Sequence, residues 1–151
     1  MSASIKLSHS IKALCYLAEC YPEPKTSKDI AESIGANASK MRQLLSMLVK
    51  QNIVASTQGV KGGFLLNQDP AKIHLQEVYC SIEDRKAFHL DVSHINGESK
   101  DRTVLFNNYF LELFADVQVE IEHKMKNINI SSIMRNLNLK SNYSVPNTKT
   151  I

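Results

Sequence analysis

Apolar residues recur at three- and four-residue intervals through residue 51, and this is the period of an amphipathic helix. The period predicts helices over residues 8–20, 27–34 and 38–51. Pro22 and Pro24 end the first helix, because proline lacks the amide donor that a continuing helix needs. Three short helices in close succession are therefore expected at the start of the chain.

Side chains suited to helix ends mark where the second and third helices begin and stop. Thr26 is a good N-cap, and Asp29 three residues later completes a near capping box. Gly35 is the usual left-handed terminator of a helix, and Asn37 can cap the next one. The second helix is therefore expected to be short, with only a tight turn between it and the third.

Two short apolar runs follow, over residues 53–56 and 64–67, joined by a glycine-containing segment at 57–63. This arrangement is typical of a β-hairpin. The order helix, helix, tight turn, helix and hairpin predicts a winged helix-turn-helix domain in residues 1–84. In such domains the third helix enters the major groove of DNA. We therefore expect a mainly α fold with a small β-hairpin.

The C-terminal part carries a second strong helical pattern. A short helix is expected over residues 75–82, then a loop, then a long helix from Arg102. The apolar residues of the long helix form one broad face: Phe106, Phe110, Leu113, Val117, Ile121, Met125 and Ile128, with Leu105, Tyr109 and Phe114 beside them. One small domain cannot easily cover so broad a face, so we expect a homodimer. The alternative is that the long helix packs on the first helix of its own chain.

The expected organisation is a DNA-binding domain in residues 1–84, a loop at 85–101 and dimerisation helices in 102–140. Residues 141–151 are rich in serine, asparagine and threonine and are expected to be a flexible tail. The long helix and the winged helix-turn-helix domain together define the expected architecture.

Composition limits the class of protein without naming its function. The chain has 151 residues, of which 43% are hydrophobic and 22% charged, and this suits one globular domain. No apolar run is long enough to span a membrane, and no export signal opens the chain. The three cysteines cannot all pair within one chain, which favours a reducing cytoplasm. We expect a cytoplasmic protein with no membrane partner.

The distribution of charge is more informative than the net charge of +3. No acidic residue lies between Glu32 and Asp69, whereas the same segment holds Lys40, Arg42, Lys50 and Lys61. Such a segment suits a surface that faces a polyanion, although an ordinary solvated face would also carry these charges. Because the segment coincides with the third helix and the hairpin, double-stranded DNA is the expected partner.

Four short motifs stand in order along residues 5–84: Ile5-Lys6-Leu7-Ser8, Lys28-Asp29-Ile30-Ala31-Glu32, Gln43-Leu44-Leu45 and Gly62-Gly63-Phe64-Leu65-Leu66. Together they resemble the Rrf2 family of bacterial transcriptional regulators. The long helix beyond them matches that family by position and pattern only. The resemblance implies a homodimeric winged helix-turn-helix protein that represses transcription, as most of the family does.

The resemblance also implies which residues contact DNA. The groove-reading positions of the family fall on Ser39, Lys40, Arg42 and Gln43. Arginine and glutamine side chains offer two-point contacts to guanine or adenine edges. In the hairpin turn, family members often carry an arginine that reaches a minor groove, and Gln58 stands there in this chain. We expect a weaker contact from Gln58, with Lys61 supplying a phosphate contact instead.

Many relatives bind an iron–sulfur cluster through three cysteines in the loop before the long helix. Residues 83–100 of this chain contain no cysteine, so no cofactor and no metal are expected. His89 and His94 lie in that loop, and a metal site that they form across a dimer is a weaker alternative. Cys15 falls on an apolar helix face, which is typical of a core residue. Cys20 and Cys80 are the candidates for a thiol that senses redox state.

Three functions remain open at this point. The first is a sequence-specific DNA-binding repressor that responds to an unidentified small molecule or protein. The second is a winged-helix protein-interaction module with weak or no DNA binding, which the glutamine at position 58 favours. The third is a thiol-based redox-sensing regulator. An enzyme is not expected, because no nucleophile–base pair, phosphate-binding glycine loop or metal-ligand cluster is visible.

Overall fold

The three-helix opening that the apolar period predicts is confirmed in the computed structural model, which describes residues 1–83 and 101–146. The helices are α1 (Ala3–Cys20), α2 (Ser27–Ile34) and α3 (Ala38–Lys50). Helix α1 begins at Ala3 rather than at residue 8, because the Ser2 side chain caps it by accepting a hydrogen bond from the Ile5 amide. None of the added residues, 3–7, is buried, so no buried apolar stripe marks this turn in the sequence.

The helix-end signals of the turn between α2 and α3 are also confirmed. The Asp29 amide donates to Thr26 Oγ1 and the Thr26 amide donates to the Asp29 carboxylate, both at 3.1 Å. Gly35 adopts a left-handed φ of 71° after the last turn of α2. The Asn37 side chain accepts a hydrogen bond from the Lys40 amide at 3.1 Å. These contacts terminate one helix and start the next within three residues, at 35–37.

One side of α3 forms the centre of the hydrophobic core. Its four core residues are between 0% and 2% exposed: Met41, Leu44, Leu45 and Leu48. They belong to one cluster with residues of α1 and α2, including Leu14, Leu17 and Ile30. Burying one leucine side chain stabilises a fold by roughly 1.5–3 kcal/mol. This side of α3 therefore fixes the helix against α1 and α2.

The predicted hairpin is confirmed and consists of β1 (Val54–Thr57) and β2 (Gly63–Leu66), paired antiparallel with Val54 opposite Leu66. Phe64 also pairs with Lys25, just before α2. The Phe64 amide donates to the Lys25 carbonyl at 2.7 Å, and the Lys25 amide donates to the Phe64 carbonyl at 3.1 Å. A Cβ atom at Gly63 would lie 2.6 Å from the Lys25 carbonyl oxygen, so only glycine fits this approach. The hairpin, or wing, is thereby held against the start of α2.

A short 3-10 helix, η1 (Pro70–Lys72), and α4 (Leu75–Ile82) follow the wing, and α4 has the bounds predicted. The chain just before α4 pairs with the connection between the last two helices. The Leu75 amide donates to the Ile128 carbonyl at 2.8 Å, and the Ile130 amide donates to the Ile73 carbonyl at 3.0 Å. These backbone hydrogen bonds join the connection between α5 and α6 to the start of α4.

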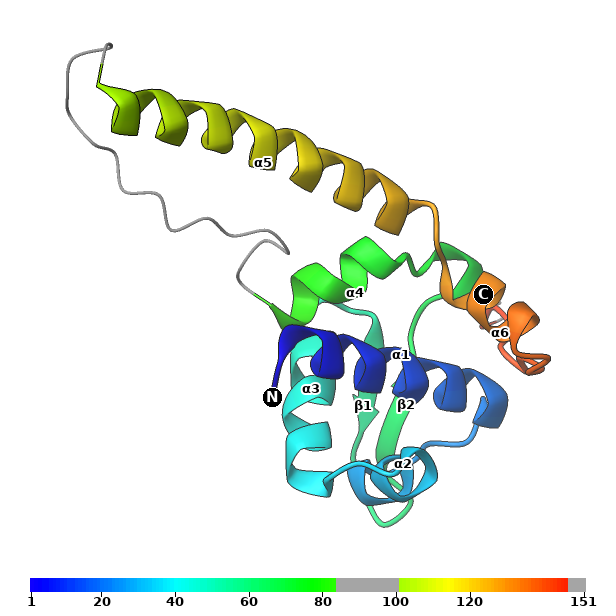
Figure 1. The fold of residues 1–151 in the computed structure, drawn as a ribbon. Coiled ribbons are helices and arrows are strands. Elements are labelled where there is room, and N and C mark those ends of the chain that lie inside the picture. Colours follow the sequence, from blue (N-terminus) through cyan, green and yellow to red (C-terminus); the bar gives the residue numbers. More distant parts are fainter. Residues whose placement is uncertain (84–100, 147–151) are drawn as a thin grey trace, which may run out of the picture.

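The long helix is α5 (Arg102–Lys126), followed by the short α6 (Ile130–Asn136). In Figure 1, α5 extends past α4 on the side of the molecule opposite the wing, and α6 turns back beside the end of α1. The loop predicted at 85–101 lies outside the described residues, apart from Asp101, whose side chain accepts a hydrogen bond from the Thr103 amide at 2.9 Å. No helix in the described ranges is both long and apolar enough to cross a membrane.

The described part of the expected tail, residues 141–146, contacts the end of α1 and the residue after it. The Asn142 amide donates to the Ala18 carbonyl at 2.9 Å, and Asn142 Nδ2 donates to the Glu19 carbonyl at 2.6 Å. The Tyr143 ring packs against the Tyr21 ring with centroids 4.8 Å apart. The last carbonyl groups of a helix have no partner within it, and Asn142 provides one for α1. Composition alone does not show such a contact.

Replacing Asn142 with alanine removes the side-chain hydrogen bond to Glu19 and keeps the backbone one. We expect Asn142→Ala to lower the free energy of unfolding by about 1 kcal/mol, the usual contribution of one such bond. Urea denaturation followed by circular dichroism measures the change. Ser144→Ala is the matched control, because Ser144 is exposed and lies two residues farther on. Equal midpoints for the two variants would contradict a capping role for Asn142.

Candidate nucleic-acid interface

Because one side of α3 is buried in the core, the residues on its opposite side face solvent. Residues spaced by three, four and seven positions share one side of a helix. Six such residues line a shallow hollow of about 470 Å³, called here the α3 face: Ser39, Arg42, Gln43, Ser46, Met47 and Lys50. The α3 face is polar apart from Met47, so it is a surface for a hydrated or charged partner.

A groove of about 660 Å³ lies between α3, the start of α2 and the wing, and is called here the α3–wing groove. Its walls carry five hydroxyl groups: those of Thr26, Ser27, Ser46, Ser56 and Thr57. Its apolar lining comes from Val49 and Phe64. The pairing between Lys25 and Phe64 places the start of α2 beside the wing, and both therefore face α3 across this groove.

Arg42 lines both the α3 face and the α3–wing groove. Its Nε group donates to the Ser27 hydroxyl at 3.5 Å, and Ser27 itself is only 4% exposed. The Ser46 hydroxyl donates to the Arg42 carbonyl at 2.8 Å, one turn along α3. The Arg42 side chain is thus held near the start of α2 while its guanidinium group keeps donors for a ligand.

Positive charge dominates the two hollows. Arg42 and Lys50 line them, and no acidic residue does. Asp29 is on α2, where hydrogen bonds from the Thr26 side chain and backbone hold the pKa of its carboxyl below the usual value. That carboxylate therefore serves the capping box of α2. The hollows offer hydroxyls, amides and cations, which are the groups that contact phosphates and base edges.

The structure brings together four of the six residues that are expected to contact DNA. Ser39, Arg42 and Gln43 share the α3 face, and Gln58 lines the α3–wing groove with Arg42. Lys40 and Lys61 are exposed but line neither hollow. Lys40 lies on the first turn of α3 and Lys61 lies between the strands of the wing, so both stand at the margins of the same surface.

The structure adds residues that sequence reasoning did not assign. Ser46, Met47 and Lys50 extend the α3 face over two further turns, and their spacing from Ser39 and Gln43 could have indicated them. Thr26 and Ser27 reach the α3–wing groove from α2. No sequence signal places these two hydroxyls beside the wing, because the contact depends on the Lys25–Phe64 pairing.

The turn of the wing is tightly constrained. The Gly62 amide donates to the Gly59 carbonyl at 3.0 Å, and Gly59 has a positive φ of 105°. The Thr57 hydroxyl donates to the Gly63 carbonyl and accepts from the Gly63 amide, at 3.3 and 3.1 Å. Val60 and Lys61 therefore project from a fixed turn into solvent.

All three cysteines lie within the described residues, and their placement does not fit an iron–sulfur cluster. Cys15 is buried, and burial, with a smaller contribution from Glu19, raises the pKa of its thiol to about 11. Cys20 is half-buried on α1, whereas Cys80 is exposed on α4 and accepts a hydrogen bond from Gln76 at 3.3 Å. Across residues 1–83 and 101–146, no three histidine, cysteine or carboxylate side chains gather as metal ligands. His89 and His94 lie outside the described residues.

Comparison with known sequences identifies the same family over most of the chain. The model of the Rrf2 family of iron-dependent transcriptional regulators matches residues 3–136. The HTH-type transcriptional regulator YwnA of Bacillus subtilis is 31% identical over 116 residues, which cover 76% of this chain and 85% of YwnA. The regulator IscR of Serratia proteamaculans is 27% identical over 117 residues, which cover 75% of this chain and 66% of IscR.

Solved structures show the same fold. T. potens IscR superposes with a TM-score of 0.67 over 91% of this chain and 88% of its own, at 22% identity. CymR, the global cysteine regulator of B. subtilis, superposes with a TM-score of 0.61 over 90% and 98% of the two chains, at 17% identity. The winged helix-turn-helix fold is thus shared, and the family model spans nearly all of it. The chain therefore belongs to the Rrf2 family of transcriptional regulators.

Proposed function

We propose that this regulator is a repressor that acts in the cytoplasm as a homodimer, binds a palindromic operator and holds no iron–sulfur cluster. The observation that carries the proposal is the acid-free surface formed by the α3 face and the α3–wing groove. Repression is supported by the resemblance to a family whose members usually repress. A two-fold dimer would place two such surfaces on half-sites about one or two helical turns apart.

The side chains of this surface suggest which residues contact bases and which contact phosphates. Arg42 and Gln43 can make two-point contacts to guanine and adenine in the major groove. Ser39 lies one turn earlier on the same α3 face and can reach either a base edge or a phosphate. The lysines at the margins, Lys40 and Lys61, are suited to phosphates as point charges. Base selectivity would therefore depend on α3, and salt-sensitive affinity on the lysines.

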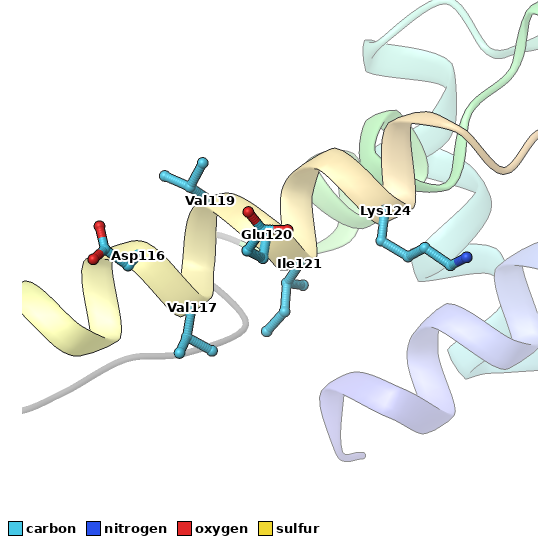
Figure 2. Close-up of a pocket in the computed structure, with 6 residues that line it drawn as sticks. All are labelled: Asp116, Val117, Val119, Glu120, Ile121 and Lys124. Atoms are coloured by element: carbon cyan, nitrogen blue, oxygen red, sulfur yellow. The ribbon is translucent and has the colours of Figure 1, made fainter.

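The exposed side of α5 supports a homodimer. Five large apolar residues in its N-terminal half are between 38% and 62% exposed: Leu105, Phe106, Tyr109, Phe110 and Leu113. Farther along, Val117 and Ile121 line a shallow hollow of about 580 Å³. Figure 2 shows these two side chains pointing to one side of α5 and Val119 pointing to the other. So large an exposed apolar stripe is typical of an interface between subunits.

A second candidate is a regulator that senses redox state through a thiol. Cys80 favours it, because this residue is exposed on α4, whose start pairs with the α5–α6 connection. Modification of Cys80 would act at the junction between the DNA-binding domain and the C-terminal helices. If Cys80→Ser abolished a response of operator binding to peroxide, this candidate would be preferred over a ligand-regulated repressor.

Arg42 should be the main determinant of base selectivity. After the operator is selected from random DNA, we expect Arg42→Ala to weaken its binding by about 1–3 kcal/mol and to relax selectivity at one position of each half-site. Arg42→Lys should restore part of the affinity and little of the selectivity, because lysine lacks the two-point fork. Gel-shift titrations against point-substituted operators measure both effects. Unchanged binding by Arg42→Ala would refute the assignment of α3, and Arg135→Ala on α6 is the matched charge control.

Salt dependence should separate phosphate contacts from base contacts. We expect the logarithm of the association constant to fall linearly with the logarithm of salt concentration. Lys61→Ala should make that slope shallower by about 1 and weaken binding alike for all operator variants. Fluorescence anisotropy across a salt series measures the slope. If the slope stays at its original value, Lys61 does not contact a phosphate.

Charges placed on the α5 stripe should separate the subunits. In a two-fold interface each substitution occurs twice, so Phe110→Glu with Leu113→Glu loses apolar contact and adds repulsion in both subunits. We expect this double variant to be monomeric by light scattering, with helical content unchanged. Val145→Glu is the matched control, because Val145 is 73% exposed and lies after α6, outside α5. A double variant that remains dimeric would show that the stripe is not the interface.

A further inference from the structure

A groove along the second half of α1 has no role in the proposed DNA contact. It lies between α1, the end of α2, and the chain of α6 and the residues that follow it, and is called here the α1–α6 groove. Its volume of about 340 Å³ is at the lower end of the range for small-molecule sites. The groove therefore has room for a ligand no larger than a short peptide.

The lining of the α1–α6 groove is mainly apolar. Ile11 and Cys15 contribute from α1, Ile34 from α2, and Ile133 and Leu139 from the C-terminal chain. Burial keeps the Cys15 thiol protonated at neutral pH, since its pKa is raised to about 11. Cys15 thus acts in this lining as a small uncharged side chain, and the groove favours a ligand with apolar side chains.

Two opposite charges lie on the α1 side of this groove. Lys12 and Glu19 are seven residues apart on α1, which separates their backbones by about 10 Å along the helix. The salt bridges in the described residues join Lys6 to Glu83 and Lys25 to Glu23, so neither Lys12 nor Glu19 is paired within that part of the chain. The groove thus presents a free cation and a free anion on either side of an apolar lining.

We propose that the α1–α6 groove binds a short apolar peptide with free ends, its carboxylate on Lys12 and its ammonium group on Glu19. An extended peptide of two residues spans about 7 Å, and the long lysine side chain covers the remaining distance. A free amino acid carries both charges on one carbon and cannot reach the two positions. An apolar acid without an ammonium group would leave the Glu19 carboxylate without an ion-pair partner in the groove.

A peptide in this groove would contact two parts of the regulator at once. Ile34 ends the first helix of the helix-turn-helix pair, whereas Ile133 and Leu139 follow the long helix α5. Binding would therefore link the position of α2 to that of the C-terminal chain and so change operator affinity. This regulatory consequence rests on the proposed function, whereas peptide binding itself does not. Coupling is reciprocal, so operator DNA should change peptide affinity by the same factor.

Calorimetry on the full chain with three peptides tests the site. Leucyl-leucine is the probe, N-acetyl-leucyl-leucine lacks the ammonium group, and leucyl-leucine amide lacks the carboxylate. We expect leucyl-leucine to bind about tenfold more tightly than either derivative, the effect of losing one charged hydrogen bond. Glu19→Gln should abolish only the preference over the acetylated peptide, and Lys12→Gln only the preference over the amide. Both substitutions are at the surface, and circular dichroism confirms that the variants are folded.

Lys28→Gln is the matched control, because Lys28 is an exposed lysine of α2 that does not line the groove. It should keep both preferences. Absence of binding, or equal binding of leucyl-leucine and the acetylated peptide, would overturn the proposal. Operator binding is measured separately, with and without saturating leucyl-leucine. A wild-type chain that binds the peptide but no DNA would refute the proposed function alone, and an unchanged operator affinity would refute the coupling.

Discussion

The burial of one side of α3 is the constraint on which the rest of the proposed DNA-binding surface depends. Met41, Leu44, Leu45 and Leu48 are almost completely excluded from solvent against α1 and α2. Because a helix has a fixed period, burying this side exposes the other, and the α3 face results. Stability and recognition are therefore linked in one helix. A polar substitution on the buried side would cost folding energy, because it would leave a polar group without a partner in the core.

The wing is fixed by backbone pairing as well as by side-chain packing, since Val54 and Leu66 are buried in the core. Phe64 exchanges two hydrogen bonds with Lys25, and the absence of a side chain at Gly63 allows the strands to approach. This pairing brings residues before α2 next to residues after α3, and the α3–wing groove lies between them. The Arg42–Ser27 contact spans the same junction. Gly63 thus allows the wing to lie beside the start of α2, where Arg42 contacts Ser27.

Helix α1 contacts both the core around α3 and the C-terminal chain. Its middle lies in the core with α3, and its last carbonyl groups bind Asn142 from the C-terminal chain. The backbone pairing near His74 and Asn129 joins the same C-terminal chain to the start of α4. As Figure 1 shows, α5 then extends on the side away from the wing. The apolar side of α5, proposed as the dimer interface, and the α3 face, proposed to contact DNA, are thereby kept on separate surfaces. The α1–α6 groove lies between α1, the end of α2 and the C-terminal chain.

Local signals in the sequence determined most of the elements of this protein. The Thr26–Asp29 capping box, Gly35, Asn37 and the apolar period set the helix-turn-helix, and they can be recognised because each acts within a few residues. The family motifs and the α3 spacing likewise pointed to Ser39, Arg42 and Gln43. The tertiary structure alone decided that Thr26 and Ser27 face the wing, that Asn142 caps α1 and that Lys12 and Glu19 flank an apolar groove. Each of these depends on contacts between segments far apart in the chain. Such contacts leave no local pattern of residues by which the sequence could reveal them.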